Sequence, residues 1–280
     1  MRSLAAAHLK RSKVRKNDPT GSNRIIREYE INLRTLFRNF GRAAGDILQN
    51  SHHLAVIDAL DSYSRHELKG ATELPKPAID LPTVTRSLDD AAKREILDPG
   101  KALTETGALK AFQQGTLFAV QTLTRAGLGG AWYGATRGGP ADWRTLDWLK
   151  VRNLEVLKGI TQEMNKKIVL ELGEGIDQGE GIPDLAKRLQ VGVNFGENRA
   201  KMMASYETMY AVNHATALRY AQAGFTEEDE EWLSAIDEKT CDICRENHGK
   251  SIAKIGYRPP IHPHDRCTTL ISKTAILRRH

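Results

Sequence analysis

Apolar residues recur at steps of three and four along most of this chain, and this period constrains the fold more than any other feature. The clearest run covers residues 24–50, where the spacing predicts an amphipathic helix. A second predicted helix follows and ends at Gly70, and a further helical pair is expected within residues 86–125. Residues 71–84 contain three prolines, which predict an extended connector.

The helical period continues in the second half of the chain. Residues 149–172 predict one or two helices, and Pro183 is expected in the first turn of a short helix over residues 183–190. A long helix is predicted over residues 194–224, with Gly224 as its cap. Small residues recur every three or four positions on two of the predicted helices, which favours close helix packing. They are Gly107, Ala111, Gly115 and Ala119 on one, and Ala204, Thr208, Ala211 and Ala215 on the other.

Positive charge is concentrated at the N-terminus. The formal net charge is +6, and six basic side chains precede the first acidic one, Asp18. Basic arms of this kind bind phosphate backbones or acidic partners through salt-sensitive contacts; a solvated terminus without a partner is the alternative. The candidate nucleic-acid-binding residues are Lys10, Arg11, Lys13, Arg15 and Lys16.

The sequence offers little that would direct the chain to a membrane or out of the cell. No stretch approaches the roughly 18 to 20 apolar residues that a membrane span needs, and the first residues lack a proper secretory apolar core. Three cysteines, two of them in a Cys-x-x-Cys motif, do not resemble a secreted disulfide framework. We expect a protein that is made in the cytoplasm and has no membrane partner.

Beyond Gly224 the helical period ends. Residues 230–237 and 250–257 predict two short strands, joined by a segment rich in turn formers. That segment holds Cys241 and Cys244, and the Cys-x-x-Cys spacing is the usual way to build one half of a tetrahedral zinc site.

The other half of such a site must come from residues 262–267, which include His262, His264, Asp265 and Cys267. We predict a structural zinc ion held by Cys241, Cys244, His262 and Cys267, with His264 and His248 as reserve ligands. The fold class that follows is mainly α with a small α+β, zinc-knuckle-like C-terminal subdomain.

Three other interpretations of the cysteines stay open. A redox Cys-x-x-Cys normally begins a helix, and the surrounding prolines and glycines argue against that. A catalytic zinc ion would need an open position and a base, for which Asp265 or Glu246 is available. The third alternative is structural thiols without metal.

The long predicted helix also carries Glu207, Tyr210 and His214 on one face, together with Met203. These polar groups form a possible acid/base set. A buried patch of mutually satisfied polar side chains is the favoured interpretation.

The C-terminal motif resembles the phage Mu protein F-like family of minor head, or head morphogenesis, proteins. The matching residues are Trp232, Asp237, Cys241, Cys244, Gly249, Pro259, Pro260, His262, Pro263, Arg266 and Cys267. Upstream, residues 174–189, the Arg199–Ala200 pair, Glu207 and Asn213 fit the same pattern. The resemblance covers roughly residues 105–272 and is most specific at its C-terminal end.

Two positions depart from the family pattern. Asp265 stands where the family usually has a cysteine. If that cysteine were an indispensable ligand, the site in this chain would either not bind metal or use Asp265 in its place. Ser205 and Tyr206 replace an Arg-Thr pair. We divide the chain into residues 1–23 as a basic flexible arm, 24–140 as an N-terminal helical region, 141–224 as the helical part of the head morphogenesis domain that the resemblance implies, and 225–280 as a Cys/His, β-containing C-terminal tip.

The resemblance implies a non-enzymatic protein of the virion, present in the capsid interior or at the portal vertex after assembly in the host cytoplasm. Its implied partners are the portal protein, the major capsid protein, or both, with packaged DNA as a further contact for the basic arm. Two alternatives remain: a zinc-containing nucleic-acid-binding module, and a metal-dependent nuclease in which His262 or His264 acts on phosphate.

Overall fold

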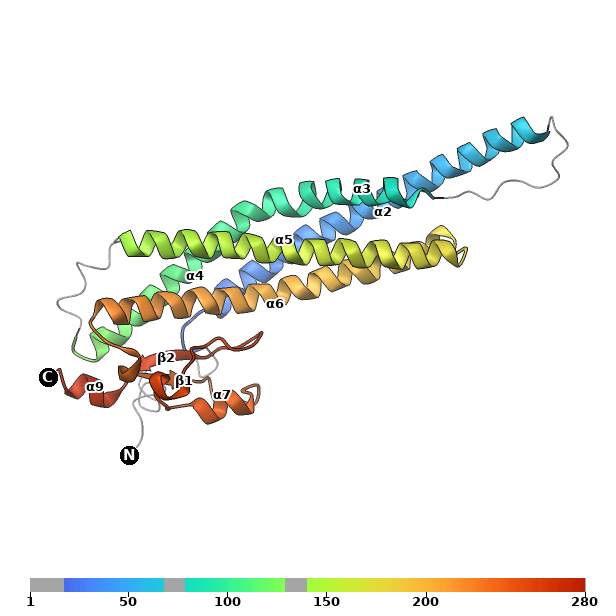
Figure 1. The fold of residues 1–280 in the computed structure, drawn as a ribbon. Helices are drawn as coiled ribbons and strands as arrows, with labels where there is room; N and C mark the ends of the chain where they lie inside the picture. Colours follow the sequence, from blue (N-terminus) through green and yellow to red (C-terminus); the bar gives the residue numbers. More distant parts are fainter. Residues whose placement is uncertain (1–17, 68–78, 129–139, 280) are drawn as a thin grey trace. The chain divides into compact units, whose positions relative to one another are not determined.

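The computed structural model describes residues 18–67, 79–128 and 140–279 (Figure 1). Within these residues the chain is mainly helical, with one two-stranded antiparallel sheet near the C-terminus, which confirms the predicted fold class. The α-helices are α2 (Asn23–Glu67), α3 (Leu81–Ala92), α4 (Asp98–Arg125), α5 (Pro140–Asp177), α6 (Ile182–Gln222), α7 (Asp242–Asn247), α8 (Ile252–Ile255) and α9 (Lys273–Leu277). The strands are β1 (Glu230–Leu233) and β2 (Thr268–Ile271).

The chain divides into two compact units, each assembled from separate stretches of sequence. The first unit comprises residues 18–31, 103–128, 140–154 and 202–279 of the described chain. The second comprises residues 32–67, 79–102 and 155–201. The helices α2, α4, α5 and α6 contribute residues to both units. The division into four consecutive domains stays a prediction.

The core of the second unit follows the period seen in the sequence. Leu33, Phe37 and Phe40 lie three or four residues apart on α2, and all three are fully buried. Sequence analysis divided α2 into two helices at about Asn50, and this was wrong. The Asn-Ser-His-His stretch that follows contains no proline or glycine, and residues of modest helix propensity do not end a helix that packing supports.

Helix α6 likewise replaces the separate short and long helices predicted for residues 183–190 and 194–224. Gly192 lies between them, and a glycine inside a helix costs only about 1 kcal/mol. A side chain there would meet Ile168, because an added Cβ would lie 2.2 Å from the Ile168 Cγ1 atom. Gly192 is therefore a site of close packing within the second unit and not a helix end. Gly224, at a φ of 77°, does end α6 as predicted.

In the first unit, α4 and α6 approach each other closely at the predicted small residues. A Cβ added at Gly115 would lie 2.1 Å from the Val212 carbonyl oxygen and 2.9 Å from the Ala215 Cβ atom. Thr216 reinforces the contact, since its hydroxyl lies 3.3 Å from the Gly115 carbonyl oxygen. The surrounding core contains Ala108, Ala111, Phe112, Leu146, Leu149, Ala211, Val212 and Ala215. The prediction of close packing is confirmed for these two helices.

Residues 225–279 of the C-terminal tip pack on the end of α6, and Figure 1 shows β2 next to the C-terminal part of that helix. Strand β1 confirms the first predicted strand, but the prediction of a second strand over residues 250–257 was wrong. Residues 252–255 form α8, because Ile252 and Ile255 also fit a helical step of three and Gly256 ends the turn at a φ of 79°, while Ser251 makes an isolated bridge to Glu231 of β1. The true partner of β1 is β2, where Trp232 pairs with Thr269.

We expect Gly115→Ala to lower the free energy of unfolding by roughly 1 to 3 kcal/mol, because the added methyl group must displace the backbone of α6. Gly159→Ala is the matched control. Gly159 lies inside α5 with nothing within 4 Å of an added Cβ, so its replacement should stabilise by up to about 1 kcal/mol. Urea denaturation followed by circular dichroism measures both values. Equal effects of the two substitutions would contradict the close approach.

Candidate metal centre

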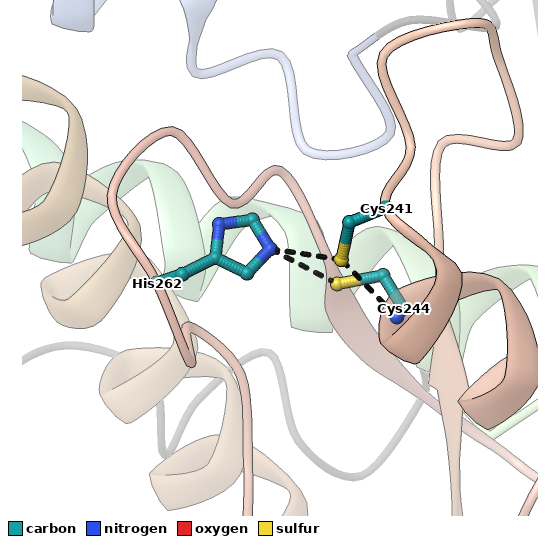
Figure 2. Close-up of side chains that lie close together, drawn as sticks. All are labelled: Cys241, Cys244 and His262. Atoms are coloured by element: carbon teal, nitrogen blue, oxygen red, sulfur yellow. Dashed lines mark hydrogen bonds between the residues drawn. The ribbon is translucent and has the colours of Figure 1, made fainter.

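Three of the predicted ligands converge in the C-terminal tip (Figure 2). The His262 Nε2 atom lies 3.2 Å from the Cys241 Sγ atom and 3.4 Å from the Cys244 Sγ atom. Cys241 directly precedes α7 and caps it, because its sulfur accepts a hydrogen bond from the Cys244 backbone N–H at 3.4 Å. His262 comes from the loop before β2. The fold therefore joins the Cys-x-x-Cys motif to a histidine that lies far along the sequence.

The hydrogen bonding of His262 prepares its ring for a metal ion. Its Nδ1 atom lies 2.8 Å from the Pro263 carbonyl oxygen. Because a carbonyl only accepts, Nδ1 carries the proton, and in the neutral ring Nε2 then presents its lone pair. Figure 2 shows that this Nε2 atom points toward both sulfurs. A backbone carbonyl on the second ring nitrogen is the usual arrangement of a metal-binding histidine.

The distances suit a tetrahedral metal ion. Zinc–sulfur bonds of about 2.3 Å and zinc–nitrogen bonds of about 2.0 Å at tetrahedral angles place sulfur and nitrogen roughly 3.5 Å apart. The two observed distances from His262 Nε2, 3.2 and 3.4 Å, are close to this value. The residues present thus fit a metal ion without a change of backbone path.

The fourth predicted ligand, Cys267, belongs to an adjoining group. The ligand atoms of Cys244, Asp265 and Cys267 lie within 4.8 Å of one another, as do those of Cys241, Cys244 and His262. Cys244 is common to both groups. The Cys267 Sγ atom lies 3.5 Å from the Ser234 hydroxyl, to which its thiol donates. The four predicted ligands therefore form one continuous cluster that could bind a metal ion.

The reserve ligands lie outside both groups. His248 accepts a hydrogen bond from the Ser234 backbone N–H at its Nδ1 atom, at 3.1 Å. His264 is exposed and has a positive φ of 64°. Neither appears among the ligand-capable groups of the described residues.

The surroundings shift the pKa values of the Cys241 and Cys244 thiols in opposite directions. Burial opposes ionisation of Cys241, but hydrogen bonds with Cys244 and His262 lower its pKa overall. The pKa of Cys244 is raised by its hydrogen bond with Cys267, by burial and by the nearby charge of Asp265. Several groups that can be negative are thus gathered at Cys244, and a bound cation would stabilise their ionised forms.

The prolines and glycines near the Cys-x-x-Cys motif were expected to prevent a helix from starting there, and this expectation was wrong. Cys241 is the N-cap of α7, so one argument against a redox role does not hold. The arrangement still favours metal binding, because a histidine nitrogen lies within 3.4 Å of both sulfurs.

An ion pair holds the two halves of the candidate centre together. The Arg266 guanidinium donates to both carboxylate oxygens of Asp237, each at 2.6 Å. Asp237 also accepts hydrogen bonds from the Lys239 backbone N–H at 3.0 Å and the Thr240 hydroxyl at 3.1 Å. Thr240 precedes Cys241 and Arg266 precedes Cys267 along the chain. Asp237 and Arg266 both belong to the family pattern in the sequence, but that pattern did not predict their ion pair.

Of the possible acid/base set on α6, only Glu207 is buried; Tyr210 is half-buried and His214 is exposed, so the predicted buried patch is confirmed for Glu207 alone. Glu207 is only 3% exposed, and it accepts two hydrogen bonds from Arg152 of α5, at 2.8 and 3.0 Å. The Arg152 guanidinium also lies 4.3 Å from the ring centroid of Tyr210, and the tilted His214 ring lies 4.5 Å from Tyr210 between ring centroids. Sequence analysis missed Arg152 because it lies on a different helix.

A groove lies between α4 and α5 in the first unit. This groove has a volume of about 390 Å³ and is mostly apolar. At its base, Arg219 forms a two-point ion pair with Asp142, at 3.1 and 2.7 Å. Trp143 and Leu117 line the groove while remaining 59% and 49% exposed. Such exposed apolar surface is typical of a protein contact.

The structure bears differently on the predicted contact with nucleic acid and on the predicted lack of a membrane partner. The basic residues Lys10, Arg11, Lys13, Arg15 and Lys16 lie outside the described residues, so their proposed contact with nucleic acid stays a prediction. Among the helices that the structure describes, each is too short or too polar to cross a bilayer.

Residues 166–270 match the family model described as phage Mu protein F like protein. This segment includes Cys241, Cys244, His262 and Cys267, so the whole candidate centre lies inside the match. The resemblance is confirmed over this part of the chain, which is shorter than the predicted span of residues 105–272. Searches of curated proteins and of solved structures each found no match.

The Asp237–Arg266 ion pair predicts a pH dependence. Arg266 lowers the pKa of Asp237 to about 2, from an ordinary value of 3.8. Because the pKa is lower in the folded protein, the ion pair stabilises the fold above about pH 4, and this contribution is lost as the pH falls toward about 2. We expect Asp237→Asn to be less stable than the parent by roughly 1 kcal/mol near neutral pH, with no difference near pH 2.

Urea denaturation across this pH range, in the presence of a metal chelator, measures the difference. Glu238→Gln is the control, because Glu238 is an exposed neighbouring carboxylate. A constant difference between Asp237→Asn and the parent at all pH values would contradict the assignment.

Proposed function

We propose that this chain is a minor head protein of a tailed bacteriophage or prophage, acting in capsid assembly at or near the portal. The observation that carries the proposal is the family match over residues 166–270, which suggests a phage head morphogenesis protein. The same match suggests that the chain is not an enzyme. The pairing of Glu207 with Arg152 supports this, since it commits the most suggestive acid/base residue to structure.

We further propose that the metal of the C-terminal tip is a structural zinc ion held by Cys241, Cys244, His262 and Cys267. Thiolate and imidazole donors together favour zinc over the hard cations that prefer oxygen. The tip has two short strands and helices of four to six residues, so its own core is small. A closed zinc site would supply folding free energy to such a subdomain.

The proposed partners are the portal protein or the major capsid protein, with packaged DNA as a contact of the basic arm. The groove between α4 and α5 supports a protein contact, since Trp143 and Leu117 expose large apolar surface there. Aromatic side chains of this kind often anchor interfaces. In this proposal the protein resides in the virion after assembly in the host cytoplasm.

The zinc proposal predicts one zinc ion per chain after purification without added zinc or chelator. Cys241→Ser and His262→Ala should lose most of it, because each removes one donor atom of the cluster. His264→Ala is the matched control and should retain zinc. Elemental mass spectrometry gives the metal content, and limited proteolysis reports the folding of the tip. Full zinc content in His262→Ala would contradict the ligand set.

The head-protein proposal predicts that the chain copurifies with assembled heads and that its deletion lowers the yield of heads. Trp143→Ser should reduce copurification without lowering the melting temperature, because this side chain contacts little of its own unit. Val151→Ser is the control, since Val151 is equally exposed on α5 but does not line the groove. Absence from purified particles, together with normal head yield after deletion, would refute the proposal.

A further inference from the structure

Asp265 is a buried carboxylate inside the loop that carries two of the candidate ligands. It is 1% exposed. One of its oxygens accepts a hydrogen bond from the Ile261 backbone N–H at 2.9 Å. The other accepts from the Cys267 backbone N–H at 2.8 Å. A single side chain thus connects both ends of the loop 261–267.

Contacts from outside the loop hold its end, where Arg266 pairs with Asp237 and the Cys267 carbonyl oxygen accepts from Asn213, so the part around His262 relies on contacts within the loop. The loop contains no regular secondary structure before β2, and His264 adopts a positive φ of 64°, a conformation that L-residues rarely adopt. The Asp265 backbone N–H donates to the His262 carbonyl oxygen at 3.2 Å, which closes a turn over His264. The Asp265 carboxylate is the contact that extends this turn to Cys267. The orientation of His262 toward the sulfurs therefore depends on Asp265.

Asp265 does not belong to the group that contains the histidine nitrogen. Its carboxylate lies with Cys244 and Cys267, whereas the His262 Nε2 atom lies with Cys241 and Cys244. Both of its oxygens already accept backbone hydrogen bonds. A metal ion between the two sulfurs and His262 would have Asp265 beside its ligands, with both carboxylate oxygens engaged by the backbone, and such a carboxylate orients ligands and balances charge.

We infer that Asp265 is a positioning residue of the metal centre: its carboxylate fixes loop 261–267 so that His262 and Cys267 face the Cys-x-x-Cys motif, and it does not itself bind the ion. This inference rests on the metal centre of the proposed function. It also accounts for the absence of the cysteine expected at this position. A cysteine offers one sulfur atom, which cannot accept from both ends of the loop as two carboxylate oxygens do.

The test is the metal affinity of three variants. Asp265→Asn retains size but replaces one acceptor oxygen with a donor, so we expect zinc affinity to fall by roughly 10- to 100-fold while one site per chain remains. Asp265→Glu keeps both acceptor oxygens and should stay closer to the parent protein. Asp265→Cys should bind zinc more weakly than the parent. Competition with a chromogenic chelator measures the affinities, and Glu246→Gln, an exposed carboxylate on α7, is the control.

Cobalt(II) substitution separates positioning from ligation. If Asp265 only positions the loop, the thiolate-to-cobalt absorption per bound ion should be the same in the parent, Asp265→Asn and Asp265→Cys. A gain of one thiolate with tighter binding in Asp265→Cys, or unchanged affinity in Asp265→Asn, would overturn the inference. Circular dichroism of the helices verifies folding, and if Asp265→Asn fails to fold, the Glu and Cys variants still decide.

The same experiment distinguishes failure of the proposed metal centre from failure of the proposed role of Asp265. A parent protein that binds neither zinc nor cobalt refutes the metal centre and the role of Asp265 with it. A parent protein that binds one ion, with Asp265→Asn binding equally tightly, refutes only the role of Asp265.

Discussion

The close approach of α6 to α4 at Gly115 is the contact on which the first unit depends. A side chain there would overlap the backbone of α6 at Val212, so the two helices pack with almost nothing between them. This brings the polar and aromatic residues of α6 to fixed positions. Next to Val212 along the helix, the Asn213 amide donates to the Cys267 carbonyl oxygen at 3.0 Å, in a buried hydrogen bond. The helix that packs against α4 thus also holds the end of the loop that carries His262 and Cys267.

The C-terminal tip shows how a small subdomain can be organised around polar contacts. Its apolar centre is modest, with Trp232, Cys244, Ile252 and Cys267 buried together. Ser234 connects this centre through hydrogen bonds, since it accepts from the Trp232 indole at 3.0 Å and donates to the Cys244 carbonyl at 2.5 Å. The Asp237–Arg266 ion pair and the Asp265 carboxylate act from outside. The Asp237–Arg266 pair joins residues 29 positions apart, whereas the contacts of Ser234 and Asp265 are closer in sequence.

The family pattern acquires a physical explanation from these contacts. Trp232 fills the centre of the tip, Asp237 and Arg266 pair across it, and Asn213 ties it to α6. The position of Asp265 is the informative departure. Its carboxylate accepts backbone hydrogen bonds from both ends of the loop, which the single sulfur of a cysteine cannot do. The loop therefore keeps its shape without the expected cysteine.

The local patterns of the sequence were enough to predict a mainly helical chain, the close packing at Gly115 and the three candidate ligands that meet in Figure 2. These predictions succeed because period, residue size and donor chemistry are properties of the residues themselves. They fail where two local structures are equally compatible with the pattern, as at Ile252 and Ile255, which form α8 and not a strand.

Tertiary structure alone decided the rest. The pairing of β1 with β2, of Arg152 with Glu207 and of Arg266 with Asp237 joins residues from separate segments, and no local pattern specifies such partners. The sequence by itself therefore determined a helical protein with a set of metal-binding donors near its C-terminus. Tertiary folding decided which of these donors come together and which carboxylate lies beside them. Such contacts join separate segments, and their energy is gained only when the segments pack together.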